Sequence, residues 1–409
     1  MSKDAKNVPA LRFKGYSDAW EKRKYGDIAK SFQYGLNAPA KKFDGINKYL
    51  RITDIDDLTR LFKQESLTSP DTNLSNASTY LLKQGDVLFA RTGASTGKTY
   101  KYRKGDGKVY FAGFLIRADL KPKFDSEFFY QTTLTDSFLD FVKVTSQRSG
   151  QPGINSKEYA NKAIQVPELS EQQRIGSVLA IYDNLIAATQ DKIDAFEQIK
   201  KAFLQHLFDQ SWRFGEYSEL WTSHLLGEIT SKVTEKNTEN LYHETFTNSA
   251  KYGIVEQQSF FDKLISNEAN LTNYYVVREN DFVYNPRISN LAPVGPVRRN
   301  KLNRTGVMSP LYYVFKATNA AYPMFLEYFF KGESWYRFMY LNGDTGARSD
   351  RFAIKDKVFE QMPVKLPEES EQKKIGALLQ NLETVMNQTQ ERLQKIRTIK
   401  DSLLKSLFV

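Results

Sequence analysis

Two long stretches of the chain carry apolar residues at alternating spacings of four and three positions. They cover residues 166–208 and 366–408, and many residues 200 positions apart are identical. Apolar residues that recur every 3.5 positions form a narrow seam along a helix, as in a coiled coil. The sequence therefore predicts two equivalent long helices. The seam positions expected to contact the other helix or a partner are Ile175, Leu179, Ile186, Ile193, Phe196, Leu207, Ile375, Leu379, Met386, Leu393, Ile396 and Leu407.

Polar residues interrupt both seams at the same two places. Thr189 corresponds to Thr389, and Lys200 corresponds to Lys400. Polar seam residues weaken a coiled coil but fix its register, so matching interruptions favour pairing of the two helices with each other. Two unrelated helices, each lying on its own domain, are the alternative. We expect an antiparallel pair, because the segment between the helices then needs only to keep its termini close together.

Each helix is preceded by residues typical of a helix start. Ser170 and Ser370 are the expected N-caps, Glu171 and Glu371 place negative charge in the first turn, and Gln173 would complete a capping box in the first copy. About 38 helical residues at about 1.5 Å each predict a rod of roughly 57 Å, with one domain at each end.

The duplication continues into an aromatic segment that opens each half of the chain. Trp20 and Trp221 are interpreted as packing at the domain edges rather than as platforms for stacked bases. The expected segments are two domains at 1–165 and 211–365 and two helices at 166–210 and 366–409. The matching residues are Arg12, Phe13, Tyr16, Ser17, Trp20, Gly26 and Ile28 in the first half and Arg213, Phe214, Tyr217, Ser218, Trp221, Gly227 and Ile229 in the second.

Each half also carries the signals of a small sheet. A turn at Asp86 leads into an apolar strand at Val87–Ala90, and Asp281 marks the equivalent turn before Phe282–Tyr284. Further strands are predicted at 49–55, 109–117, 274–277 and 311–316, and helices at 128–144 and 324–340.

The expected fold class is α+β: two similar mixed α/β domains separated by two long helices that form an antiparallel coiled coil, with pseudo-twofold symmetry. Between the matching landmarks, residues 31–79 and 230–273 share no alignable pattern. A common frame with unlike inserts favours two domains that do the same kind of task on different targets.

Composition narrows the class of partner. Lysine and arginine exceed acidic residues by 58 to 48, a net charge of +10, which favours a polyanion; a basic surface that only aids solubility is the alternative. The chain has no cysteine, so disulfides and thiolate metal sites are excluded. No long apolar run or export signal is present, so we expect a cytoplasmic protein without a membrane partner.

The segment RTGASTGKT, residues 91–99, is similar to a phosphate-binding P-loop. That motif needs four residues between its glycines, whereas Gly93 and Gly97 enclose three, and a basic, turn-rich segment follows where a helix should begin. Nucleotide binding is therefore disfavoured. A P-loop enzyme remains an alternative function, which measurable ATP binding would support.

Two stretches without acidic residues favour contacts with phosphates instead. They cover residues 87–105 and the interval between Asp281 and Glu327, and both are rich in lysine or arginine. The loops at 147–155 and 342–351 add Gln and Arg side chains suited to base edges. Solvated basic loops and ordinary turns are the alternatives. The candidate DNA-binding residues are Arg91, Ser95, Thr96, Lys98, Lys101, Arg103, Arg148, Gln151, Arg287, Asn290, Arg298, Arg299, Arg348 and Arg351.

Signatures of catalysis are missing from the sequence. The three histidines, His206, His224 and His243, are too few and too scattered for a metal cluster or a convincing triad. We therefore expect no catalytic residue, no metal site and no cofactor in this chain.

The pattern resembles the specificity (S) subunits of type I restriction-modification systems along the whole chain. The resemblance rests on PELSEQQRIG and PEESEQKKIG at the two helix starts, on Trp20 and Trp221, and on KQGDVLFARTGASTGK at residues 83–98. It implies that 1–165 and 211–365 are target recognition domains, each reading one half of a bipartite site on double-stranded DNA. It also implies that 166–210 and 366–409 are spacer helices that dock two methyltransferase (M) subunits and, through them, restriction (R) subunits.

The resemblance further implies a non-catalytic subunit in a complex that uses S-adenosylmethionine, ATP and Mg²⁺. Unlike inserts imply an asymmetric target, and a rod of roughly 57 Å corresponds to about 17 base-pair steps of 3.4 Å. The alternative is a stand-alone DNA-binding regulator that dimerises through its helices.

Overall fold

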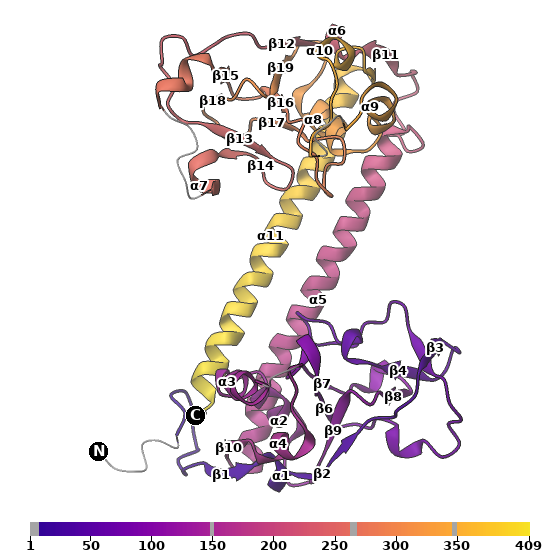
Figure 1. The fold of residues 1–409 in the computed structure, drawn as a ribbon, viewed down its shortest axis with the longest axis vertical. Coiled ribbons are helices and arrows are strands. Elements are labelled where there is room, and N and C mark those ends of the chain that lie inside the picture. Colours follow the sequence, from indigo (N-terminus) through magenta and orange to yellow (C-terminus); the bar gives the residue numbers. More distant parts are fainter. Residues whose placement is uncertain (1–7, 148–150, 262–267, 346–349) are drawn as a thin grey trace. The chain divides into compact units, whose positions relative to one another are not determined.

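The computed structural model describes residues 8–147, 151–261, 268–345 and 350–409. The chain divides into two compact units (Figure 1): unit 1 comprises Met1–Lys192 and Thr389–Val409, and unit 2 comprises Ile193–Gln388. The long helices α5 (Leu169–Phe208) and α11 (Glu369–Leu407) each contribute residues to both units. In the described part of the chain, no helix combines the length and apolar character needed to cross a membrane.

Both units contain a four-stranded antiparallel sheet with the same strand order. In unit 1 the order is β2 (Ala29–Tyr34), β9 (Leu115–Leu120), β6 (Val87–Ala90) and β7 (Thr99–Lys101). In unit 2 it is β12 (Thr230–Lys232), β19 (Tyr313–Ala317), β16 (Phe282–Tyr284) and β17 (Val297–Arg299). The predicted strands β6 and β16 are confirmed, and every residue in them is buried because they lie inside the sheet.

The aspartate turns before these two strands are also equivalent. One carboxylate oxygen of Asp86 accepts the amide N–H of Lys83 at 2.9 Å, and one of Asp281 accepts that of Arg278 at 2.7 Å. Burial of the two carboxyl groups raises the pKa of each to about 6. The same local hydrogen bond therefore begins the same strand in both units.

A second small sheet in each unit joins the opening segment to the strand that leads into a long helix. The pairs are β1 (Glu21–Lys24) with β10 (Ala163–Val166) and β11 (Thr222–Leu225) with β20 (Pro363–Leu366). The short helices beside them are α1 (Tyr25–Ile28), α4 (Ser156–Asn161), α6 (Leu226–Ile229) and α10 (Asp356–Phe359).

The inserts are built differently in the two units. Unit 1 pairs β3 (Ala40–Lys42) with β5 (Thr68–Pro70), and β4 (Lys48–Leu50) in parallel with β8 (Val109–Phe111). Unit 2 has the hairpin β13 (Phe246–Ser249) and β14 (Gly253–Glu256), helix α7 (Gln257–Phe261), and the antiparallel pair β15 (Tyr275–Val277) and β18 (Gly306–Met308). The 3₁₀ turns are Ile52–Asp54, Ser78–Tyr80, Gly93–Ser95, Lys104–Asp106 and Glu268–Asn273.

Three sequence expectations about element bounds are wrong. The strand at 49–55 stops at Leu50, because Asp54 binds the amide and guanidinium of Arg51 and closes a 3₁₀ turn. The strand at 109–117 is two strands separated by a turn, and the strand at 311–316 begins only at Tyr313.

The single helices expected at 128–144 and 324–340 are helix pairs. They are α2 (Ser126–Thr132) with α3 (Asp136–Thr145), and α8 (Pro323–Lys331) with α9 (Tyr336–Asn342). In unit 1, the hydroxyls of Thr132 and Thr133 bind carbonyls three residues earlier, which competes with continuation of the helix. In unit 2, α8 ends at Gly332, which has an extended backbone and accepts the indole N–H of Trp335 at 3.0 Å.

Trp20 and Trp221 are packed side chains, as predicted, but they lie in the cores rather than at the domain edges. Trp20 is 2% exposed and contacts Phe128 and Phe408 edge-on at 5.9 and 6.3 Å between ring centroids. Trp221 contacts Phe325 and Phe208 in the same way, at 5.7 and 6.5 Å. Each core is thus completed by the last residues of a long helix.

The helix starts differ from the prediction. The helices begin at Leu169 and Glu369, so Ser170 and Ser370 lie inside the first turn. Their hydroxyls donate to the carboxylates of Glu168 and Glu368. A capping box completed by Gln173 is therefore wrong.

The first-turn glutamates instead form buried ion pairs with the opening segments. Glu171, whose side chain is fully buried, accepts two hydrogen bonds of 2.8 Å from Arg12. Glu371 accepts two from Arg213, at 3.0 and 2.7 Å. The shared arginine of each opening segment thus fixes that segment to a helix start.

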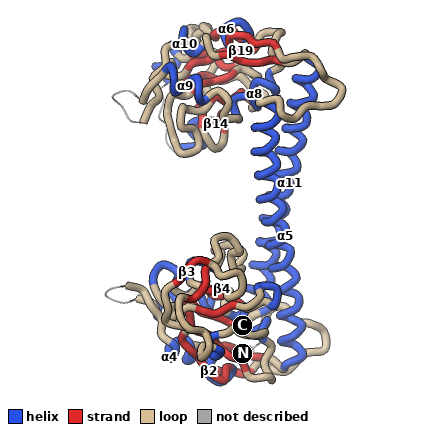
Figure 2. The backbone as a smooth tube through the Cα atoms, turned by 90° about the vertical axis from the view of Figure 1, so that its right-hand side faces the viewer, coloured by secondary structure: helices blue, strands red, loops and turns tan. Residues whose placement is uncertain are grey.

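The two long helices pair with each other in both units (Figure 2). In unit 1, Lys400 Nζ lies 2.5 Å from Asp183 Oδ1, and Arg397 contacts Gln190 farther along α5, so the helices run antiparallel. In unit 2, Lys200 Nζ lies 2.7 Å from Glu383 Oε1. The predicted pairing is confirmed, and both seam lysines cross to a carboxylate on the other helix.

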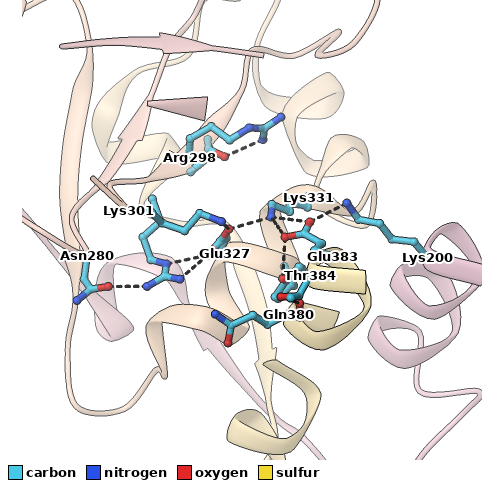
Figure 3. A network of polar contacts seen from close by, with 12 residues as sticks. Lys200, Asn280, Arg298, Lys301, Glu327, Lys331, Gln380, Glu383 and Thr384 are labelled. Atoms are coloured by element: carbon cyan, nitrogen blue, oxygen red, sulfur yellow. Dashed lines mark hydrogen bonds and ion pairs between the residues drawn. The ribbon is translucent and has the colours of Figure 1, made fainter. Parts of the chain in front are cut away.

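Glu383 is the centre of a charged network in unit 2 (Figure 3). Lys331 on α8 donates to both of its oxygens at 2.8 and 2.9 Å, and Tyr328 donates at 2.9 Å. Lys331 also lies 2.8 Å from Glu327. Burial would raise the pKa of Glu383, but the charges of Lys331 and Lys200 outweigh burial and lower it to about 2. The network joins α5, α8 and α11 within one unit.

We predict that Glu383→Gln lowers the free energy of unfolding by about 3 kcal/mol at pH 7, since a shift from 4.5 to about 2 corresponds to about 1.4 kcal/mol per pKa unit. The folded-state pKa lies below the unfolded value. The contribution is therefore present above about pH 4.5 and is lost as the pH falls toward 2. Urea unfolding at several pH values should show a deficit that narrows in acid.

The matched control is Glu369→Gln, which breaks the exposed i,i+4 pair with Lys373 on α11. It should leave the stability nearly unchanged at each of these pH values, because water screens an exposed pair. A Glu383→Gln deficit that stays constant between pH 7 and pH 3 would contradict the assigned role of the carboxylate charge.

Candidate nucleic-acid interface

Three surface segments of unit 1 meet at Arg91, the residue that follows β6. The Arg91 amide donates to the carbonyl of Phe114 at 3.0 Å, and the Arg91 carbonyl accepts the amide of Ile154 at 2.9 Å. A further bond of 2.9 Å runs from the Gly93 amide to the Pro152 carbonyl. We call residues 91–97, 112–115 and 151–155 the unit 1 loop cluster.

Unit 2 has an equivalent arrangement at Pro286. Its carbonyl accepts the amide of Phe352 at 2.7 Å, and the amide of Ile288 donates to the carbonyl of Asp350 at 3.0 Å. The turn at 309–312 lines the same cleft as Pro286. We call residues 285–290, 309–312 and 350–353 the unit 2 loop cluster. Loops that are separate in the sequence are thus adjacent in each unit.

The RTGASTGKT segment does not have the local structure of a P-loop. A P-loop opens a helix, whereas here the 3₁₀ turn Gly93–Ser95 is followed by strand β7. Gly93 and Gly97 have φ values of +72° and +84°, and the hydroxyl of Thr96 donates to the Gly93 carbonyl at 2.7 Å. The glycines therefore serve a tight turn at the end of the sheet.

Several of the candidate cations are engaged in ion pairs inside their own unit. Lys98 pairs with Asp57 and its side chain is only 10% exposed. Lys101 Nζ lies 2.5 Å from Glu127. Arg299, at the position in β17 equivalent to Lys101, lies 2.6 Å from Glu327. These side chains attach inserts and helices to the central sheet.

Arg91 is half-buried, whereas Arg287 is exposed. The Arg91 guanidinium lies over the ring of Tyr34, 4.9 Å from its centroid. The Arg287 side chain is 71% exposed and 3.9 Å from the carboxylate of Asp350. Arg351 is half-buried and its backbone bridges to that of Arg287. These arginines lie in the two loop clusters.

The remaining candidates occupy varied positions. Arg103 is half-buried in unit 1, and Ser95 lies half-buried in the 3₁₀ turn. Gln151 and Asn290 are exposed within the loop clusters. The Arg298 guanidinium donates to the carbonyls of Val297 and Ala250, and burial lowers its pKa. Arg148 and Arg348 lie outside the described residues.

Two features of this surface were missed from the sequence. Tyr34 belongs to a stretch without an alignable partner, so nothing linked it to Arg91. The unit 2 cluster borders two clefts, of about 480 and 850 Å³. Asn248, 2% exposed in β13, lines the smaller one together with Arg287 and Arg351. The sequence gives no distinct signal for Asn248, because its strand also contains the polar residues Thr247 and Ser249.

Comparison with known proteins finds similarity to one family. Residues 17–198 match the model of the type I restriction modification DNA specificity domain. The chain is 23% identical over 254 residues to the type I restriction enzyme MjaVIII specificity subunit of Methanocaldococcus jannaschii, covering 59% of this chain and 56% of that protein. It is 27% identical over 199 residues to the putative type I restriction enzyme MjaX specificity subunit of the same organism, covering 46% and 45%. The chain thus spans about half the length of these curated relatives.

A solved structure shares the fold across nearly the whole chain. The crystal structure of a type I restriction-modification system S subunit from M. genitalium is 13% identical, with a TM-score of 0.63, over 98% of this chain and 99% of that one. The architecture defines a duplicated two-domain protein whose halves share a frame and differ in their inserts. In the matched domain and in these relatives, the chain is similar to the specificity subunits of type I restriction-modification systems. The resemblance seen in the sequence is confirmed.

We predict that Gly97→Ala destabilises the unit 1 loop cluster. A Cβ at this position would lie 2.5 and 2.7 Å from the methyl carbons of Val142, and φ is +84°. Backbone strain and the steric clash should each cost about 1–3 kcal/mol, measured by urea unfolding.

Gly45→Ala is the matched control, because Gly45 has φ of +89° but open space around its Cβ position. It should show the backbone strain alone. Val142→Ala in the Gly97→Ala background should recover part of the loss. If both glycine variants lose equal stability and Val142→Ala restores none of it, the predicted clash is contradicted.

Proposed function

We propose that this chain is the DNA-recognition subunit of a type I restriction-modification complex and binds a bipartite, asymmetric site on double-stranded DNA. One observation carries the proposal: the same three-segment loop cluster occurs at the same place on the same frame in both units, with different residues in each. Equivalent positions suit equivalent tasks, and different side chains suit different half-sites. The chain itself would perform no catalysis.

The proposed domains are 1–165 and 211–365 for target recognition, with 166–210 and 366–409 as spacer helices. Helices of 40 and 39 residues at about 1.5 Å per residue are long enough to space two half-sites by several base pairs. The helices would also dock two M subunits and, through them, R subunits. The assembled complex would use S-adenosylmethionine, ATP and Mg²⁺, none of them bound by this chain.

The loop clusters suggest how the candidate residues divide their tasks. We expect Arg91, Arg287 and Arg351 to contact phosphates or guanine edges, with Gln151 and Asn290 at base edges. Ser95 and Thr96 would support phosphate contacts beside Arg91, and Arg103 would add a more distant one.

The buried or paired cations would act indirectly in this proposal. Lys98, Lys101 and Arg299 already neutralise carboxylates, so they would hold the loops in place rather than release counterions from DNA. Arg298 would keep the end of β13 in position through the Ala250 carbonyl.

The function is tested by producing the full chain together with its cognate M subunit and mapping adenine methylation across a genome. We expect a split motif with two unlike half-sites. Exchanging residues 211–365 for those of a relative should change one half-site and leave the other intact. A continuous motif, or no motif in the presence of an assembled complex, would overturn the proposal.

A second test addresses the arginines directly. Arg287→Ala should weaken DNA binding and reduce the slope of log K against log salt by about one, because one phosphate contact is lost. Arg91→Ala should do the same for unit 1. Fluorescence anisotropy over a salt series measures both quantities.

Arg304→Ala is the matched control for the salt series. It removes the same charge from the same acid-poor stretch, but Arg304 is already bound to Glu244. Its slope should stay at the wild-type value. Equal slopes for Arg287→Ala and wild type would place Arg287 away from the DNA backbone.

A further inference from the structure

Each unit exposes one large apolar side chain at the tip of an equivalent turn. In unit 1, the amide of Leu115 donates to the carbonyl of Ala112 at 2.9 Å, and Phe114 is the third residue of that turn. In unit 2, the amide of Tyr312 donates to the carbonyl of Ser309 at 3.1 Å, and Leu311 is the third residue. Phe114 is 57% exposed and Leu311 is 64% exposed.

Strand register shows that the two positions correspond. Ile116 pairs with Phe89 in unit 1, and Tyr313 pairs with Tyr284 in unit 2. Phe89 and Tyr284 each lie three residues after the aspartate of the preceding turn. Phe114 lies two residues before Ile116, and Leu311 lies two residues before Tyr313. The turn residue before it is Gly113 in one unit and Pro310 in the other, so the large apolar side chain is the conserved feature of the two turns within this chain.

Both turns belong to the loop clusters. The Phe114 carbonyl accepts the Arg91 amide, so the backbone of Phe114 adjoins that of the arginine that lies over Tyr34. Leu311 lies between the two clefts of unit 2, and Arg287 and Arg351 line one of them. Each exposed apolar group is therefore close to cations suited to phosphates.

We propose that Phe114 and Leu311 are apolar wedges that insert between base pairs of the bound duplex, one in each half-site. This inference rests on the proposed function. Apolar wedges of this size partly unstack a base step and kink the helix, and flexible pyrimidine–purine steps yield most easily. The cations of each loop cluster would hold the phosphates on either side.

The local structure suits this task. A hydrogen-bonded turn holds each apolar residue at its tip, and Pro310 fixes one backbone angle beside Leu311. A wedge that is already ordered loses little entropy when it binds. A single apolar side chain among arginines is a poor centre for a protein interface, which usually needs several buried anchors. Duplex DNA offers both the stacked bases and the negative charge.

The test uses the full chain assembled with its M subunit and duplexes containing the methylation-mapped site. 2-Aminopurine replaces adenine at one position at a time in each half-site, because its fluorescence rises when stacking is lost. Wild type should increase the fluorescence at one step in each half-site. Phe114→Ala should remove the increase only in the half-site read by unit 1, and Leu311→Ala only in the other, with affinity reduced about tenfold in each case.

Two control positions lie outside the loop clusters. Leu58→Ala in unit 1 and Leu220→Ala in unit 2 remove exposed leucines, at 63% and 87% exposure. They should leave both signals unchanged. Phe114→Leu and Leu311→Phe should retain the signals, since either apolar side chain can unstack a step.

The outcomes separate this inference from the proposed function. If wild type binds the split site and the alanine variants give the same fluorescence increase as wild type, the wedge proposal is overturned and the DNA-recognition function stands. Loss of M-subunit capture in the same variants would overturn the wedges in favour of a protein contact. Failure of the wild-type complex to bind any duplex specifically would overturn both.

Discussion

The register of α5 against α11 is the constraint on which the rest of the structure depends, and buried charge sets it. Lys400 is 7% exposed and Lys200 is half-buried, and each has its carboxylate partner on the other helix. Sliding one helix by a heptad would leave these charges without partners in an apolar seam, which is costly. The same helices contribute to both cores, with Leu407 in the core that contains Trp20 and Leu207 in the core that contains Trp221. Helix register and domain packing therefore have to be satisfied together.

Charged side chains also form ion pairs beside the central sheets. In the sequence, the lysines and arginines of the two stretches without acidic residues have no neighbouring carboxylates to balance their charge. In space, Lys98 meets Asp57, and Arg299 meets Glu327 from outside its own stretch. Net charge thus overstates the number of cations free to meet a polyanion. The cations that remain at the surface, Arg91 and Arg287 among them, gather where loops meet at the ends of the central strands.

Local patterns predicted much of the fold because their causes are local. The spacing of apolar seam residues predicted both long helices, and an aspartate turn followed by an apolar run predicted β6 and β16. The misses depended on partners distant in sequence. Glu171, expected only to place charge in the first turn of α5, forms a buried pair with Arg12, 159 residues away. The candidate site was found as separate loops, since backbone bonds between them leave no mark in the residue types.

Those backbone bonds also explain how one frame tolerates unlike inserts. The bonds that join each loop cluster run between amides and carbonyls, from Ile154 to Arg91 in unit 1 and from Phe352 to Pro286 in unit 2. These bonds form wherever the strand ends at the right position, whatever the side chains are. The frame can therefore keep its buried Asp86 and Asp281 turns while the exposed residues change. The parallel pairing of β4 with β8 and the antiparallel pairing of β15 with β18 show how far the inserts differ without disturbing that junction.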